Sequence, residues 1–290
     1  IRRNIHFAEG DPFNDRDITN VNTRLRNLNF FKKIDINSNK LNGNDYSVNI
    51  DVDEQPTGDF QIGLTFGTIE GATLITELNE KNIAGTGRDL SFAINTSENK
   101  SKYKLSTKEP FAFNQPIDLL YGVEFTEKDL SSSASYEVDT LKFDSGINFN
   151  ISDKLIYGFN INYELKDYTI TDSSTASTSI INSSGKNVFI NFINDLNYYD
   201  LNSFFNPTEG TSLYYQNTIS PSTNSNGSLV KNSIVHRKFI PIDDSIFSIQ
   251  TKLGNITSLE NKEILNDNKF SLGGSWLRGF DIYGAGPKKF

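Results

Sequence analysis

Residues 154–166 read KLIYGFNINYELK, and this stretch decides the fold because its side chains alternate between apolar and polar. The odd positions from Leu155 to Leu165 carry six large apolar residues, while the even positions from Gly158 to Lys166 carry glycine, amides and charges. Such alternation is typical of a β-strand with one apolar face. Six apolar residues in this pattern span about 36 Å, which after a tilt of about 45° matches the apolar height of an outer membrane. A soluble β-sandwich also alternates, but its strands are usually only about five or six residues long.

The same period of two continues through most of the chain after residue 58. Residues 59–67, for example, place Phe60, Ile62, Leu64 and Phe66 on one face and polar or small residues on the other. Eleven runs of this kind predict strands at residues 59–67, 72–80, 87–96, 102–109, 117–127, 137–151, 154–168, 186–201, 210–220, 230–240 and 245–255.

The connections between these runs predict the orientation of the sheet. One set is tight and rich in Gly, Pro and Asp, whereas most of the other set is longer and of low complexity, as in residues 169–185. Short turns on one rim and longer loops on the other are the asymmetry of a bacterial outer-membrane barrel, whose turns face the periplasm. We therefore expect a mainly β protein, a transmembrane antiparallel barrel whose first strand rises from the periplasm.

An odd number of strands indicates that the chain is truncated. Bacterial barrels close with an even number of strands, and an open sheet leaves backbone edges that lipid cannot satisfy. The last residues, GAGPKKF at 284–290, also lack the alternation of a closing strand. We expect further strands downstream of residue 290.

The first 56 residues predict a separate small α+β domain. Residues 1–7 resemble a short strand, and the apolar spacing over residues 18–28 predicts a helix with Asp15 or Asp17 as its N-cap. Alternating runs at 31–38 and 46–54 predict a hairpin. Residues 56–58 would form a brief hinge, so the predicted domains are residues 1–56 and 57–290.

Composition and charge exclude several classes of function. The net charge of −8 argues against a nucleic-acid partner, because such binding needs clustered Lys and Arg. The absence of cysteine excludes disulfides and thiolate metal sites. The two histidines, His6 and His236, lack metal-ligand spacing, and GTGRD at 85–89 joins two strands without opening a helix. We therefore expect no metal, no cofactor and no enzymatic activity.

Residues 273–280, GGSWLRGF, carry the most specific motif and follow the eleventh predicted strand. Other segments also carry a resemblance to a known family. They are the N-terminal stretches 1–10 and 24–36, the junction 51–68, and the turns EPFAFNQP, FFNPTEGTSL and FIPIDD. On these residues the sequence resembles the BamA-like outer-membrane protein assembly factors, a family that carries polypeptide-transport-associated (POTRA) domains ahead of a barrel.

The resemblance implies a barrel of about sixteen strands, of which about eleven lie in this chain. Residues 1–56 would then be the last periplasmic POTRA domain, and residues 256–290 would begin a loop that folds back into the lumen. In its motif of Leu277, Arg278, Gly279 and Phe280, the guanidinium would pin the loop to a carboxylate on a later strand. Gly279 would permit the bend, and Phe280 would pack beside it.

By the same resemblance the protein would insert and fold barrel proteins in the bacterial outer membrane. Its expected partners are unfolded outer-membrane clients, assembly-complex lipoproteins and outer-membrane lipid. An exposed sheet edge can template an incoming strand through main-chain hydrogen bonds. The expected edge, a lateral seam, is the first strand, whose glycines weaken its packing; its residues are Phe60, Gln61, Ile62, Gly63, Leu64, Thr65, Phe66, Gly67 and Thr68.

Two other classes of protein remain open at this point. A passive outer-membrane pore would share the barrel but would need neither the POTRA-like domain nor the Arg278 loop. A two-partner secretion transporter carries both features and exports a single substrate.

Overall fold

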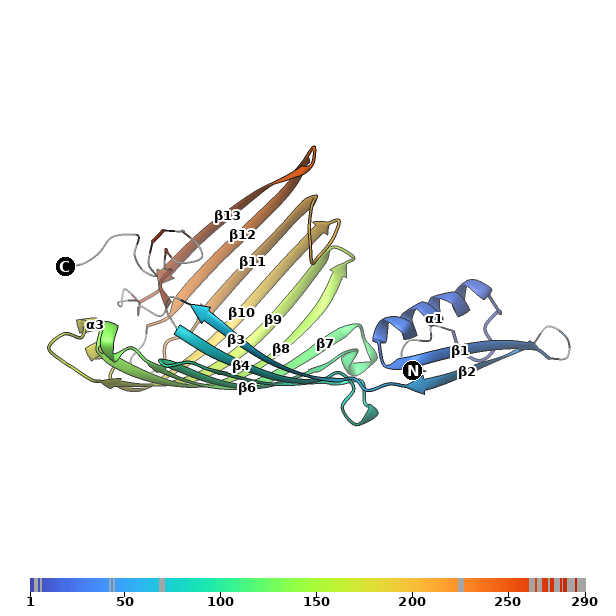
Figure 1. The fold of residues 1–290 in the computed structure, drawn as a ribbon, viewed down its shortest axis with the longest axis horizontal. Coiled ribbons are helices and arrows are strands. Elements are labelled where there is room, and N and C mark those ends of the chain that lie inside the picture. Colours follow the sequence, from blue (N-terminus) through green and yellow to red (C-terminus); the bar gives the residue numbers. More distant parts are fainter. Residues whose placement is uncertain are drawn as a thin grey trace.

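The structure is a computed structural model that describes residues 1, 2, 5, 7–41, 43, 45–67, 71–223, 227–260, 264, 268–270, 272, 273, 277, 279, 280 and 285. Eleven strands form one antiparallel sheet in which each strand pairs with its neighbours in the chain. The sheet curves into an open trough, with the first and last of these strands at its two edges (Figure 1). The strands are β3 (Gly58–Gly67), β4 (Gly71–Glu80), β5 (Asp89–Thr96), β6 (Lys100–Glu109), β7 (Ile117–Asp129), β8 (Tyr136–Ser152), β9 (Leu155–Ile170), β10 (Gly185–Leu201), β11 (Gly210–Ser220), β12 (Leu229–Ile242) and β13 (Ser245–Ser258).

The eleven predicted strands are confirmed, and every observed strand end lies within three residues of its predicted place. Strands β8, β9 and β10 are 17, 16 and 17 residues long. Such lengths exceed those of ordinary soluble strands. Among the described residues, no helix is both long and apolar enough to cross a membrane.

The N-terminal domain packs helix α1 (Asp15–Leu28) on a hairpin of β1 (Phe31–Lys40) and β2 (Tyr46–Glu54). Its core consists of Val21 and Leu25 from the helix and Ile34 from the hairpin. Val21 and Leu25 lie on the apolar side of the predicted helix, and Ile34 lies on one face of the predicted hairpin. Burial of these two apolar surfaces against each other holds the helix on the hairpin.

Two predictions for this domain are wrong in detail. The N-cap of α1 is Asn14, whose side chain accepts from the Arg16 amide, because Asn14 holds the extended backbone that a cap requires. Asp15 and Asp17 instead occupy the first turn, where the helix dipole favours acidic groups. The described residues of 1–7 form no strand, although Ile5 and Phe7 pack on the core. The other three residues of that stretch lie outside the described part.

The predicted hinge is displaced by one residue toward the N-terminus, to residues 55–57. Gly58 already begins β3 and pairs with Glu80 at the end of β4. The Thr57 hydroxyl donates to the same Glu80 carboxylate, and the Gln55 amide donates to the Phe30 carbonyl at 3.0 Å. Only residues 55–57 therefore connect the two sheets without belonging to a strand.

The connections between strands do not show the full length asymmetry that the sequence predicted. One rim carries residues 81–88, 110–116, 153–154, 202–209 and 243–244, and the other carries 68–70, 97–99, 130–135, 171–184 and 221–228. Two turns of the first set are as long as the last loop of the second. The difference shrinks because β7 and β9 take residues up to Asp129 and Ile170, which the sequence assigned to loops.

Two short helices cover the concave face of the sheet at the loop end. They are α2 (Ser131–Ala134) and α3 (Thr178–Asn182). Ile180 of α3 forms a buried cluster with the strand residues Tyr136, Val138 and Tyr168. Ile180 of the connection 171–184 is therefore packed against these strands, whereas residues 173–175 and 177–178 are exposed.

Candidate functional site

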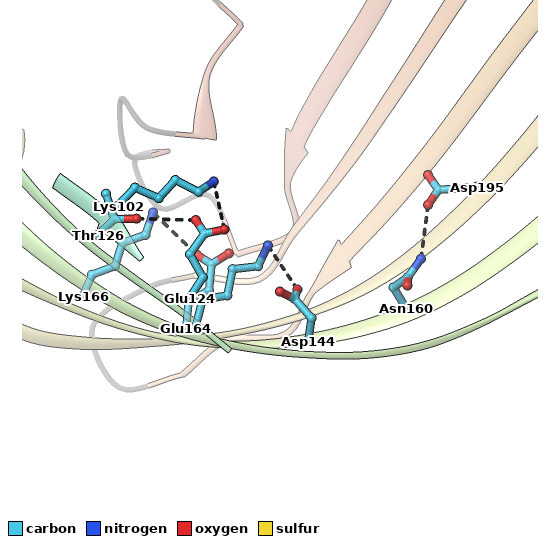
Figure 2. Close-up of polar contacts among 9 residues, drawn as sticks. Lys102, Glu124, Thr126, Asp144, Asn160, Glu164, Lys166 and Asp195 are labelled. Atoms are coloured by element: carbon cyan, nitrogen blue, oxygen red, sulfur yellow. Dashed lines mark hydrogen bonds and ion pairs between the residues drawn. The ribbon is translucent and has the colours of Figure 1, made fainter. Parts of the chain in front are cut away.

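The concave face of the sheet is lined by paired charges. Lys102 Nζ lies 2.9 Å from Glu124 Oε2, and Lys142 Nζ lies 3.1 Å from Asp144 Oδ1. Figure 2 shows Lys102, Glu124 and Asp144, with Glu164 and Lys166, rising from neighbouring strands on one side of the ribbon. Charges in this number are stable only where water or counter-charges reach them, so the concave face has the chemistry of a hydrated wall.

Asp195 lies deeper along the same face and is held by neutral donors. Its Oδ1 accepts from the Tyr214 hydroxyl at 2.8 Å and from Gln216 Nε2 at 2.9 Å, and its Oδ2 accepts from Asn160 Nδ2 at 3.3 Å. Among the described residues no cation comes within ion-pair distance of this carboxylate. Asn162, which is 7% exposed, lies nearby with an Oδ1 atom that has no partner in the described part of the chain. Both groups line a recess of about 480 Å³.

The convex face is mainly apolar, as the alternation predicted, but one row of amides crosses it. Asn194, Asn217, Asn232 and Asn255 stand opposite one another on β10, β11, β12 and β13. Asn194 Nδ2 donates to Asn217 Oδ1 at 3.4 Å, and Asn217 Nδ2 donates to Asn232 Oδ1 at 2.9 Å. The Tyr157 and Tyr215 hydroxyls donate to Asn194 and Asn232, respectively. In the sequence these asparagines occupy positions where the alternation would place apolar residues. That departure could have indicated the row, but the strand prediction did not use it.

The predicted seam strand β3 forms one edge of the sheet. Its backbone pairs with β4 from Gly58 to Gly67, and among the described strands β4 is its sole neighbour. The apolar side chains of this strand are largely exposed, from 62% for Phe60 to 83% for Phe66. A Cβ atom added at Gly63 or Gly67 would meet nothing within 4 Å. Thr68 lies outside the described residues.

After β13 the chain returns along the concave face. Because β13 continues to Ser258, this return segment begins at residue 259 and not at the predicted residue 256. Asn268 and Phe270 contact Lys231 on the concave side of β12. Farther along, Leu272 and Ala285 form an isolated antiparallel bridge.

The predicted loop motif lies between the two bridge residues. The Phe280 amide donates to the Leu277 carbonyl at 3.3 Å, and Gly279 has a φ of +89°, a value that favours glycine. The role of Gly279 in a bend that places the motif stays a prediction. Arg278 lies outside the described residues, so its anchoring role stays a prediction.

The described residues offer no group of three or more His, Asp or Glu side chains that could hold a metal ion. His236 Nε2 instead lies 2.9 Å from the Thr211 hydroxyl. His6 lies outside the described part.

An exposed ion pair connects the tight turn between β8 and β9 to β10. Lys154 Nζ donates to Asp200 Oδ1 on β10 at 2.7 Å. This hydrogen bond and the charge of Asp200 raise the pKa of Lys154 above its ordinary value. The turn is thereby tied to a strand that is its neighbour in the sheet but distant in the chain.

Comparison with known proteins identifies the family. The model of the Omp85 superfamily domain matches residues 82–290, and a POTRA model, described as a surface antigen variable number repeat, matches residues 1–55. The chain belongs to the Omp85 superfamily. The curved sheet is thus part of an outer-membrane barrel, with its convex face toward lipid and the N-terminal domain in the periplasm.

Within this family the chain resembles BamA proteins. It is 21% identical over 297 residues to the outer membrane protein assembly factor BamA of Neorickettsia risticii (strain Illinois), across 99% of this chain and 39% of that protein. It is 26% identical over 211 residues to BamA of Buchnera aphidicola subsp. Acyrthosiphon pisum (strain APS), across 70% of this chain and 32% of that protein. The chain therefore spans well under half of these relatives.

Solved structures show the same fold. The crystal structure of BamA from Haemophilus ducreyi lacking POTRA domains 1–3 matches 99% of this chain and 58% of that chain, with a TM-score of 0.88 at 19% identity. CdiB from Escherichia coli matches with a TM-score of 0.60 at 13% identity, over 97% of this chain and 55% of that one. The chain therefore shares its fold with these structures.

Proposed function

We propose that this chain is part of a factor that inserts and folds β-barrel proteins into the bacterial outer membrane. The likeness to proteins named as BamA assembly factors supports this function. The observation that carries the mechanism is the place of β3 as the first strand of the sheet, beside β4 alone among the described strands, because a closed barrel would have its seam at this strand. Unpaired N–H and C=O groups on a membrane strand cost free energy in lipid, so an incoming client strand that pairs with them gains stability.

The proposed step is strand addition without covalent chemistry. A client presents an extended terminal strand, and β3 supplies a row of backbone donors and acceptors at alternate residues. The exposed apolar side chains of β3, from Phe60 to Phe66, then continue across the client strand on its lipid side. We expect the process to need no nucleotide, metal or cofactor.

Cysteine crosslinking tests the role of β3. The chain has no cysteine, so single cysteines along residues 60–68 can be paired with one in the terminal strand of a stalled client. We expect disulfides along β3 with a constant register between the two strands. The matched scan covers residues 159–163 of β9, which has strand partners on both sides. Crosslinks that form only in loops, or equally along β9, would contradict the proposal.

The second candidate is a two-partner secretion transporter that exports one substrate. The structural likeness to CdiB fits this candidate. Depletion of the complete protein separates the two, because an assembly factor is needed for outer-membrane barrels in general and a transporter for one secreted protein. A passive pore would instead give conductance in liposomes with no folding of clients.

We propose three kinds of partner for the assembly factor. The first is the unfolded outer-membrane protein client, and the second is outer-membrane lipid at the convex face. Lipoproteins of an assembly complex would bind the periplasmic side. If the purified protein folds clients at the full rate without any lipoprotein, lipoproteins are not required partners.

A further inference from the structure

The aromatic side chain of Phe270, in the return segment after β13, packs directly over Gly254 of the barrel wall. A Cβ atom added at Gly254 on β13 would lie 2.6 Å from Cζ of Phe270 and 2.8 Å from its two Cε atoms. Real Cβ atoms do not approach ring atoms so closely, so any larger side chain at residue 254 would displace the ring. Gly254 therefore forms a hole in the concave wall, and Phe270 fills it.

Lys231 holds the ring in this place from the neighbouring strand. Ser233 pairs with Gly254 and Lys231 pairs with Ile256, so Lys231 rises from the same face one rung farther along. Its Nζ lies 4.6 Å from the centroid of the Phe270 ring and donates to the Asn268 carbonyl at 3.0 Å. A single ammonium group thus makes a cation–π contact with the ring and a hydrogen bond to the backbone two residues before it.

The contact lies at the base of the segment that carries the loop motif. Leu272 follows Phe270 by two residues and pairs with Ala285, so residues 272–285 form a loop closed by that bridge. Leu277, Gly279 and Phe280 lie within the closed loop. Fixing Phe270 on the wall fixes one end of this loop relative to β12 and β13.

We propose that Phe270, seated over Gly254 and held by Lys231, is a positioning residue that sets where the motif at 277–280 stands inside the barrel. This anchor is separate from the one predicted for Arg278, because it acts on the base of the loop and uses strands that the chain itself contains. It concerns loop placement alone and does not depend on the proposed assembly function.

The test measures the mobility of the loop motif in the complete, membrane-embedded protein. A spin label is attached to a single cysteine at residue 277, by Leu277→Cys in a cysteine-free background. We expect an immobilised spectrum in the parent protein. Gly254→Ala should raise the ratio of mobile to immobile label about tenfold, since it removes both the packing and the cation–π contact. Lys231→Met, which keeps an unbranched apolar stem but removes the ammonium group, should give a smaller increase.

Matched variants separate positioning from general damage. Gly122→Ala makes the same chemical change on the concave face, where the new Cβ would lie 3.6 Å from the nearest atom, and it should leave the spectrum unchanged. Adding Phe270→Leu to Gly254→Ala should recover part of the immobile signal, because the smaller side chain leaves room for the new methyl group. A heat-shift assay on gels establishes that each variant barrel is folded.

Three results would overturn the proposal. An unchanged spectrum in both Gly254→Ala and Phe270→Ala would show that the loop is held elsewhere. An equal change in Gly122→Ala would show that the effect is not specific to the contact. A Gly254→Ala and Phe270→Leu double variant that is more mobile than Gly254→Ala alone would show that the two residues do not share a site.

Discussion

Two glycines in the long strands leave room, by lacking a side chain, for the side chain of the residue opposite. A Cβ atom at Gly146 would lie 1.9 Å from Asn160 Oδ1, and one at Gly158 would lie 2.6 Å from Asn148 Oδ1. The two pairs are reciprocal, since Gly146 stands opposite Asn160 and Asn148 opposite Gly158 across β8 and β9. The sequence suggests only that strand glycines weaken packing. Here the missing side chain lets a partner amide lie flat on the wall.

We predict that Gly146→Ala destabilises the barrel by about 1–3 kcal/mol, the usual cost of overpacking. The new methyl group would push Asn160 away from Asp195, whose carboxylate it reaches at 3.3 Å. Urea unfolding of the complete protein in lipid vesicles measures the change in the free energy of unfolding. Gly122→Ala serves as the control and should cost much less. Equal losses in the two variants would contradict the close approach of Asn160.

At the scale of elements, the row of asparagines is the main departure from a uniformly apolar outer face. An amide in lipid is tolerated when its donors and acceptors are satisfied. Tyr157, Asn194, Asn217 and Asn232 satisfy one another in sequence across β9 to β12. The row therefore links four strands through their side chains in addition to their backbones.

Asn217 is the central member of this row, and we predict that Asn217→Leu destabilises the sheet by about 1–3 kcal/mol despite its gain in apolar surface. It would leave Asn194 Nδ2 and Asn232 Oδ1 each without one partner. Asn255→Leu at the exposed end of the row should be close to neutral. Urea unfolding in vesicles compares the two, and a larger loss at Asn255 would show that the row does not act as described.

At the loop end of the sheet, the concave face carries apolar residues where the alternation would place polar ones. Tyr136 and Tyr168 stand on the concave side of β8 and β9 with ring centroids 5.9 Å apart, and α3 covers them through Ile180. The concave face is thus dry at this end and hydrated farther down. Alternation over single strands does not reveal the change, because the covering helix comes from a distant loop.

Removing Tyr168 should open this cover. Tyr168 is 2% exposed, and we predict that Tyr168→Ala costs about 3 kcal/mol locally, which exposes residues 171–184 to protease added outside the cells. Tyr163→Ala on the convex face is the matched control, since Tyr163 is 41% exposed. Cleavage that is the same in both variants would contradict the packed cover.

At the scale of the whole molecule, the sequence predicted the sheet better than the site. Period two in residues such as Phe60 to Phe66 specifies the strands, because a one-residue slip would move every apolar side chain to the wrong face. The roles of Gly254, Phe270 and Lys231 could not be predicted in this way. Their contact joins segments that approach only after the sheet has curved, so neither spacing nor composition places them together.

The two faces of the wall are the claim on which every other inference depends. Spin labels placed one at a time at residues 157–165 of the complete protein report access to oxygen dissolved in lipid and to a water-soluble nickel chelate. We predict oxygen maxima at odd positions such as Phe159 and Ile161, and chelate maxima at even positions such as Asn160 and Glu164. Accessibility without a period of two, or with the two phases exchanged, would contradict the account.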